Sequence, residues 1–293
     1  MKRLVICCDG TWNELDYRAR PVTNVVKLAQ SVRFRDQKGV PQIVFYDEGV
    51  GTLEGEGAQG GGFGDGLIQN IMDGYTFLAF NYDPGDEIYI FGFSRGAYTA
   101  RSLAGMIRNC GIVRRDCIGK AADALRLYKD KTIKPSDTAS IEFRRATNPS
   151  NWWINAKEEP DLAAAHPDKR LAVSYLGVWD TVGQLGVPGV FNALARREED
   201  EGFHDLQLSS FVQRARHAVA IDEERAVFRP TLWDDQSLEE LRTRAKDDPA
   251  RRAEEDGPPY QQVWFPGDHG SVGGGGDICG LSDYALQWVA EGA

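Results

Sequence analysis

The chain has 293 residues, of which 34 are basic and 44 acidic, and its net charge of −10 disfavours binding to nucleic-acid phosphates or, by charge alone, to anionic lipid. Its composition is 42% hydrophobic, 27% charged and 10% aromatic, which excludes a fibrous or largely disordered chain. No apolar run approaches the ~18 residues of a membrane span, and the apolar stretch that follows Met1 is too short for a signal peptide. The five cysteines form no CxxC pair, so we expect reduced thiols and synthesis in the cytosol.

Apolar runs of strand length alternate with helical periodicity along the chain. This pattern predicts an α/β fold with a mostly parallel sheet and helices on both faces. The expected strands are Leu4 to Cys8, Ile43 to Tyr46, Ile88 to Phe91, Leu171 to Trp179 and Tyr260 to Phe265. Helices are expected from Thr23 or Asn24, over residues 67–79, from Ser94 to a stop at Gly111, and at the end of the chain after a cap at Ser282.

Three segments interrupt this alternation. Residues 49–66 are half glycine and follow a strand, which predicts a mobile loop over the site. Residues 114–170 and 234–258 have the character of insertions, and we expect insertions to cap the active-site end of the sheet. We expect a single catalytic domain over residues 1–293.

The strongest functional signal is the pattern G-x-S-x-G around Ser94, formed by Gly92 and Gly96 between a buried strand and a small-residue helix. A nucleophile elbow needs this arrangement, because the serine occupies a strained strand-to-helix turn and the glycines let strand and helix approach closely. The pattern therefore predicts a serine nucleophile and a serine hydrolase of the α/β-hydrolase type.

A serine nucleophile needs a histidine base, and the chain offers four. His269 follows the last expected strand, where this fold carries its base, and it is our choice. His166 and His204 lie in polar stretches and are expected at the surface, and His217 is expected to be a buried structural residue.

The acid should follow an intervening strand. Asp180 ends the run Leu171 to Trp179 and is the expected acid, while Asp222, after another apolar stretch, is the rival. For the oxyanion hole we expect backbone N–H groups of Arg95, directly after the nucleophile, and of Gly10 and Thr11, after the first strand.

Six segments in this order carry a resemblance to a known family. The chain resembles the bacterial and fungal α/β-hydrolase family of largely uncharacterised proteins that includes the catalytic domain of type VI secretion phospholipase effectors. The matching segments are Cys8 to Asn13, Gly49 to Thr52, Gly92 to Arg101, Gly177 to Gly183, Ala220 to Arg225 and Trp264 to Gly275. The resemblance implies a triad of Ser94, Asp180 and His269 and hydrolysis of an ester, in the effectors a phospholipid acyl ester. It also leaves open an export route that needs no signal peptide.

The chain departs from the family pattern at one position near the base. The family usually has an aspartate two residues after the histidine, where this chain has Ser271. That departure motivates a non-catalytic interaction domain with a decayed site as one alternative, and an esterase for small non-lipid esters is another. A phosphatase of the haloacid-dehalogenase type is disfavoured, because its nucleophilic aspartate would stand where Cys7 is.

Further ligands are not indicated. The glycines of residues 273–276 have no P-loop lysine, and the carboxylates near the expected site match no EF-hand, so we expect no cofactor and no metal. An acyl chain could lie on the apolar stretch after the acid, at Leu185, Val187 and Phe191 together with Val190 and Leu194. The expected partner is a lipid or another ester, with no nucleic acid and no transmembrane segment.

Overall fold

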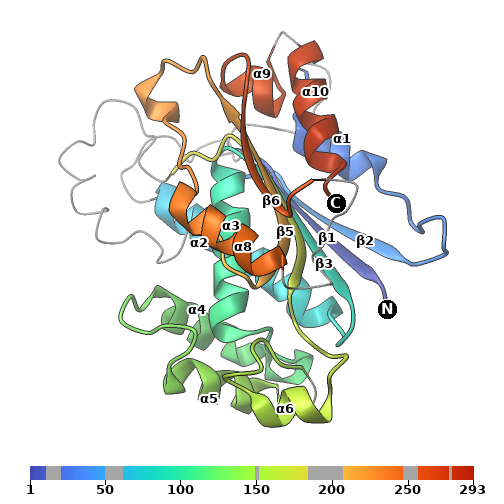
Figure 1. Cartoon of the computed structure of the whole chain (residues 1–293), viewed down its shortest axis with the longest axis vertical. Helices are drawn as coiled ribbons and strands as arrows, with labels where there is room; N and C mark the ends of the chain where they lie inside the picture. Colours follow the sequence, from blue (N-terminus) through green and yellow to red (C-terminus); the bar gives the residue numbers. More distant parts are fainter. Residues whose placement is uncertain (11–20, 50–61, 149–151, 184–206, 247–256, 277–278) are drawn as a thin grey trace.

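The computed structural model describes residues 1–10, 21–49, 62–148, 152–183, 207–246, 257–276 and 279–293. Its described strands form one parallel sheet in the order β2-β1-β3-β4-β5-β6 (Figure 1). Their bounds are β1 Arg3–Cys8, β2 Gln42–Asp47, β3 Glu87–Phe93, β4 Val173–Trp179, β5 Val212–Ala220 and β6 Tyr260–Phe265. This confirms the predicted α/β class and its parallel sheet.

Helices cover both faces of the sheet, as expected. One face packs against α1 (Asn24–Ser31), α9 (His269–Gly273) and α10 (Cys279–Ala290), and the other against α2 (Gly62–Asn81), α3 (Arg95–Cys110) and α8 (Asp235–Lys246). The strand side chains alternate between these layers: Leu4 and Ile6 of β1 enter the α3 side, and Val5 and Cys7 the α10 side. No described helix is both long and apolar enough to cross a membrane.

Aromatic side chains fix α10 to the sheet. Tyr175 and Trp179 of β4 are buried and donate hydrogen bonds to the carbonyl oxygens of Val289 and Ala285, at 2.5 and 3.2 Å. Each ring thus buries apolar surface while its polar atom keeps a partner. These contacts hold the C-terminal helix over the strand that precedes Asp180.

The insertion at residues 114–170 does not cap the active-site end, contrary to the expectation. Its helices are η1 (Arg115–Lys120), α4 (Ala121–Lys129), α5 (Thr138–Thr147) and α6 (Pro160–Ala165), which follow α3 (Figure 1). Since α3 has 16 residues and rises about 24 Å, it carries the chain away from Ser94 before the insertion begins. The insertion therefore packs at the opposite end of the sheet.

The structure corrects two more expectations. Residues 212–220 form β5, a strand that the sequence analysis did not predict because Gln213, Arg214 and Arg216 interrupt its apolar pattern. Ser282 lies inside α10, which begins at Cys279, so it does not cap that helix; its hydroxyl donates to the Cys279 carbonyl oxygen at 2.9 Å. Thr23, by contrast, caps α1 as expected, because its side chain accepts the Val26 N–H.

Candidate active site

Ser94 and Asp180 have unusual backbone conformations. Among the described residues they are the non-glycine residues with positive φ, at 58° for Ser94 and 37° for Asp180. Such strain costs of order 1–3 kcal/mol and persists where the surroundings enforce it, often at functional sites. Ser94 sits between β3 and α3, and its side chain makes no capping hydrogen bond to α3, so the hydroxyl is not used to stabilise the helix.

Two glycines allow this turn to form. A Cβ atom at Gly96 would lie 2.1 Å from the Cys8 carbonyl oxygen, and one at Gly92 would lie 2.4 Å from the Gly96 carbonyl oxygen. Both distances are far below van der Waals contact, so the packing requires glycine. The first turn of α3 thus rests directly against the end of β1, as a nucleophile elbow demands.

The Asp180 carboxylate reaches the His269 imidazole from the neighbouring strand end. Oδ2 of Asp180 lies 2.6 Å from Nδ1 of His269, and Oδ1 accepts the Ala220 N–H at 2.9 Å. Asp180 is fully buried, while His269 keeps 7% exposure. Further hydrogen bonds link the Ser94 N–H to the Trp179 carbonyl oxygen (3.1 Å) and the Asp180 N–H to that of Ala218 (2.7 Å).

His269 also contacts two aromatic rings, and its main-chain N–H forms a hydrogen bond. The Phe93 and Phe228 rings lie 4.5 and 4.6 Å from the imidazole, centroid to centroid, and the Phe228 ring is nearly parallel to it. The His269 N–H donates to Oε2 of Glu223 at 3.1 Å. No sequence pattern predicted a role for Glu223 or Phe228, although Glu223 belongs to the Ala220 to Arg225 segment of the family resemblance.

The rival residues have other partners. Asp222 accepts the Gly267 N–H at 2.7 Å, which ties the loop before His269 to the end of β5. His217 is fully buried on β5, and burial lowers its pKa to about 3, so its ring stays neutral. Its Nδ1 faces the Gln262 side chain and its Nε2 faces Thr181, next to Asp180. His166 follows α6 in the insertion, and His204 lies outside the described residues.

The segment expected to supply oxyanion donors is only partly described. The Gly10 N–H donates to Oδ1 of Asp9 at 2.7 Å, so this amide already has a partner. Asp9 is fully buried and also accepts the hydroxyls of Thr23 and Tyr46, at 2.6 and 2.9 Å, and burial raises the pKa of Tyr46. Arg95 opens α3 beside this segment. Thr11 lies outside the described residues, and Gly10 and Arg95 remain predicted donors.

Other expectations concern residues that the structure does not describe. Leu185, Val187 and Phe191, with Val190 and Leu194, lie outside the described residues, as do residues 50–61 of the glycine-rich segment. Residues 62–66 begin α2, so the expected loop is shorter than the range 49–66. Gly49 is described: a Cβ there would lie 2.7 Å from the carbonyl oxygens of Asp9 and Gly10, so this segment starts against the end of β1.

Ser271, where the family pattern has an aspartate, takes part in capping α9. Its N–H and its hydroxyl both donate to Oδ1 of Asp268, at 2.9 and 2.7 Å, and these contacts lower the pKa of Asp268. Asp268 is the N-cap of the short helix whose first residue is His269. Ser271 thus supports the segment that carries the histidine.

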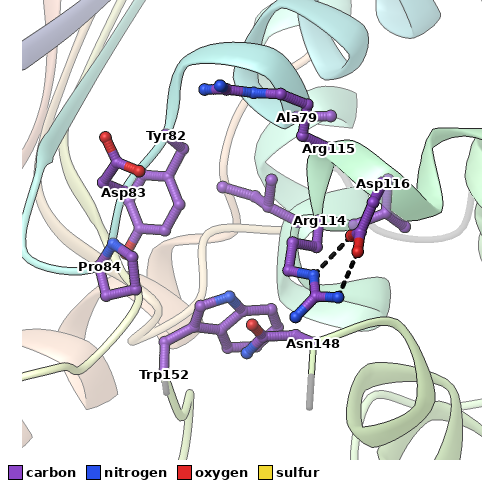
Figure 2. A pocket seen from close by; sticks show the side chains of 11 residues that line it. Ala79, Tyr82, Asp83, Pro84, Arg114, Arg115, Asp116, Asn148 and Trp152 are labelled. Carbon is purple, nitrogen blue, oxygen red and sulfur yellow. Dashed lines mark hydrogen bonds and ion pairs between the residues drawn. The ribbon is translucent and has the colours of Figure 1, made fainter. Parts of the chain in front are cut away.

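A pocket of about 440 Å³ lies far from these residues, between the end of α2 and the start of the insertion. Figure 2 shows Tyr82 and Pro84 on one side, Trp152 at the base, and Arg114 paired with the Asp116 carboxylate. None of its lining residues is Ser94, Asp180 or His269. The pocket is therefore separate from the candidate site at the end of β3.

Comparisons with known proteins show which sequences and structures the chain resembles. The family model described as "T6SS, Phospholipase effector Tle1-like, catalytic domain" matches residues 2–292. The uncharacterized protein YEL023C of Saccharomyces cerevisiae is 27% identical over 243 residues, which cover 78% of this chain but 32% of that protein.

The solved structures that match the chain are more distant in sequence. The Tle1 effector bound to the VgrG spike of the type VI secretion system has a TM-score of 0.48 and 17% identity, over 94% of this chain and 51% of that chain. An uncharacterized protein from Pseudomonas aeruginosa has a TM-score of 0.47 and 14% identity, over 99% of this chain and 45% of its own. The chain thus spans a third to a half of these relatives.

Proposed function

We propose that this chain hydrolyses acyl esters of phospholipids through a nucleophilic serine. The proposal starts from its family: the chain belongs to the Tle1-like catalytic domains of type VI secretion phospholipase effectors. The observation that carries the proposal is the contact between Asp180 and His269 beside Ser94 in a strained elbow. Family membership suggests the lipid ester, and the elbow and the Asp180–His269 pair suggest the covalent mechanism.

The proposed reaction begins with proton transfer. His269 Nε2 takes the proton of the Ser94 hydroxyl as its oxygen attacks the acyl carbonyl, while the Asp180 carboxylate stabilises the imidazolium through Nδ1. The imidazolium then donates the proton to the leaving alcohol, which leaves an acyl-enzyme. Water, activated by His269, attacks the acyl carbonyl and releases the fatty acid, with Ser94 reprotonated.

The tetrahedral intermediates carry a negative oxygen that needs donors. We propose the Arg95 N–H as one donor and a main-chain N–H of Gly10 or Thr11 as the other. Support comes from the contact of α3 with the end of β1, which brings Arg95 and Gly10 to the same end of the sheet. For Gly10 to bind the oxyanion, its N–H must give up its hydrogen bond to the Asp9 carboxylate or donate to both acceptors.

The apolar stretch with Leu185, Val187 and Phe191 is the proposed acyl-chain site. Each buried CH₂ contributes about 0.8 kcal/mol, so four more methylenes should raise kcat/KM by about two orders of magnitude from butyrate to octanoate esters. Phe191→Ala should flatten this dependence. A flat profile in the unchanged protein would contradict a lipid substrate and favour a small ester.

The test of the proposed function is fatty-acid release from phosphatidylcholine and phosphatidylethanolamine vesicles. The unchanged protein should release fatty acid, and Ser94→Ala should reduce release by several orders of magnitude with an unchanged urea midpoint of unfolding. Ser94→Ala removes one hydroxyl that does not cap α3, so it should not alter the fold. Equal release by both proteins would refute the serine mechanism.

A further inference from the structure

The segment after β5 forms several hydrogen bonds with the end of β6 and the loop before His269. The Ile221 N–H donates to the Phe265 carbonyl oxygen at 3.0 Å, the Asp222 N–H to that of Gly267 at 3.2 Å, and the Gly267 N–H returns a bond to the Asp222 side chain. This segment includes the Asp222-Glu223-x-Arg225 pattern, which the proposed reaction does not use. Its contacts with the segment of His269 suggest that it has a function at the site.

Glu223 binds the main chain of the histidine. Its side chain is 2% exposed, and Oε2 accepts the His269 N–H at 3.1 Å. Arg225 covers the same carboxylate, with Nε 2.8 Å from Oε1 and Nη2 2.6 Å from Oε2. This guanidinium lowers the pKa of Glu223 to about 2, so the acceptor for the His269 N–H stays charged.

Arg225 also reaches the ring of the histidine through an aromatic neighbour. Its guanidinium lies 4.4 Å from the centroid of the Phe228 ring, and that ring stacks on the His269 imidazole at 4.6 Å with an angle of 20°. Arg225 thus links a carboxylate that holds the His269 main chain to a phenyl ring that holds its side chain.

Such support has a physical reason. The hydrogen bond to Asp180 fixes one ring nitrogen, yet the ring can still pivot about it, and the preceding Gly267 has a φ of 101° in a short loop. Proton transfer needs the other nitrogen within hydrogen-bond distance of the reacting oxygens, and misplacement by 1 Å can cost about 10²-fold in rate.

We propose that Glu223, Arg225 and Phe228 form a positioning unit, here called the histidine clamp, that fixes the main chain and ring of His269 for proton transfer. The proposal rests on the proposed function, in which His269 is the base. None of the three residues needs to touch the substrate. Among the described residues, the charged groups that the contacts place around the base are Asp180 on the β4 side, Glu223 and Arg225 on the β5 side, and Asp268 before it, 4.0 Å from Arg225.

The test measures the rate and the extent of labelling by a fluorophosphonate separately. Rate constants report how well His269 activates Ser94, whereas the final labelled fraction reports how many molecules are folded. Glu223→Ala should lower the rate constant about 10²-fold, and Glu223→Gln should lower it less, because its amide oxygen can still accept the His269 N–H. Both variants should still reach one label per chain.

Matched substitutions separate the clamp from a general loss of ion pairs. Arg225→Lys keeps the charge beside Glu223 but loses the planar face over Phe228, so the labelling rate should fall about tenfold. Arg145→Lys is the control: Arg145 forms a comparable bidentate salt bridge with Asp161, and both residues are exposed in the insertion. This substitution should leave the labelling rate unchanged. With p-nitrophenyl butyrate, kcat should fall in the clamp variants while KM stays constant.

The histidine ring gives a spectroscopic readout that does not need turnover. The chain has four histidines, so ¹⁵N-histidine labelling yields few signals, and the signals of His269 should broaden or shift in Glu223→Ala while those of His217 stay. Unchanged labelling rates and unchanged His269 signals in Glu223→Ala would overturn the clamp alone. Variants that lose labelled fraction at an unchanged rate would also overturn it, as a purely structural role. An unchanged protein that the probe does not label would overturn both the clamp and the proposed function.

Discussion

Replacement of Asp180 by asparagine removes one charge next to His269 with almost no change in size. In the proposed mechanism the imidazole becomes positive 2.6 Å from Asp180 Oδ2, and at an effective dielectric constant of about 20 two unit charges at that distance attract by about 6 kcal/mol. Since each 1.36 kcal/mol is a factor of ten in rate, Asp180→Asn should lower kcat by about 10⁴-fold.

The assay for this prediction is hydrolysis of p-nitrophenyl butyrate, with Asp222→Asn as the matched control. Asp222 accepts the Gly267 N–H, which an asparagine oxygen can still do, so its kcat should remain within about threefold. Urea unfolding of each variant verifies the fold. A kcat of Asp180→Asn within tenfold of the unchanged protein, or an equal loss in Asp222→Asn, would refute the assignment of Asp180 as the acid.

Two stability predictions follow from the same region. Gly96→Ala should lower the free energy of unfolding by about 1–3 kcal/mol, because its Cβ would lie 2.1 Å from the Cys8 carbonyl oxygen; an unchanged urea midpoint would contradict the elbow packing. His217, with its folded pKa lowered to about 3, stays neutral while its unfolded form binds a proton below about pH 6.5, so stability falls as pH drops from 6 to 4. His217→Gln should reduce this slope by about 1.4 kcal/mol per pH unit, and equal slopes would show that His217 does not titrate on unfolding. Burial raises the pKa of Asp47 to about 6, and this shift makes stability rise as pH drops. It contributes equally to the slopes of the unchanged protein and of His217→Gln, so it does not affect their difference.

Most of the sheet and the residues of the candidate site at its end follow from local sequence patterns. The apolar runs around Ile6, Ile90 and Val178 are buried on both faces of the sheet, so composition alone marks them as parallel strands. Ser94 is marked by two glycines that only a tight strand-to-helix contact requires. His269 and Asp180 follow from the chain order that such a fold imposes.

What local patterns do not reveal depends on contacts between distant segments. β5 escaped prediction because a charged residue in a strand is expected to be exposed, whereas Arg216 is buried. Its guanidinium contacts the carbonyl oxygen and the ring of Trp288 on α10, and hydrophobic periodicity does not encode such a contact. The place of the 114–170 insertion depends on the length and direction of α3. Glu223 and Phe228 lie beside His269 because β5 and β6 are neighbours in the sheet. The sequence motif alone therefore did not predict these contacts.

The assignment of Ser94 as the nucleophile can be tested by peptide mapping with mass spectrometry after the folded protein has reacted with a fluorophosphonate. We expect one adduct per chain, on the peptide that contains Ser94, and none in Ser94→Ala or after unfolding in urea. An adduct on another residue, or equal labelling of Ser94→Ala, would contradict it.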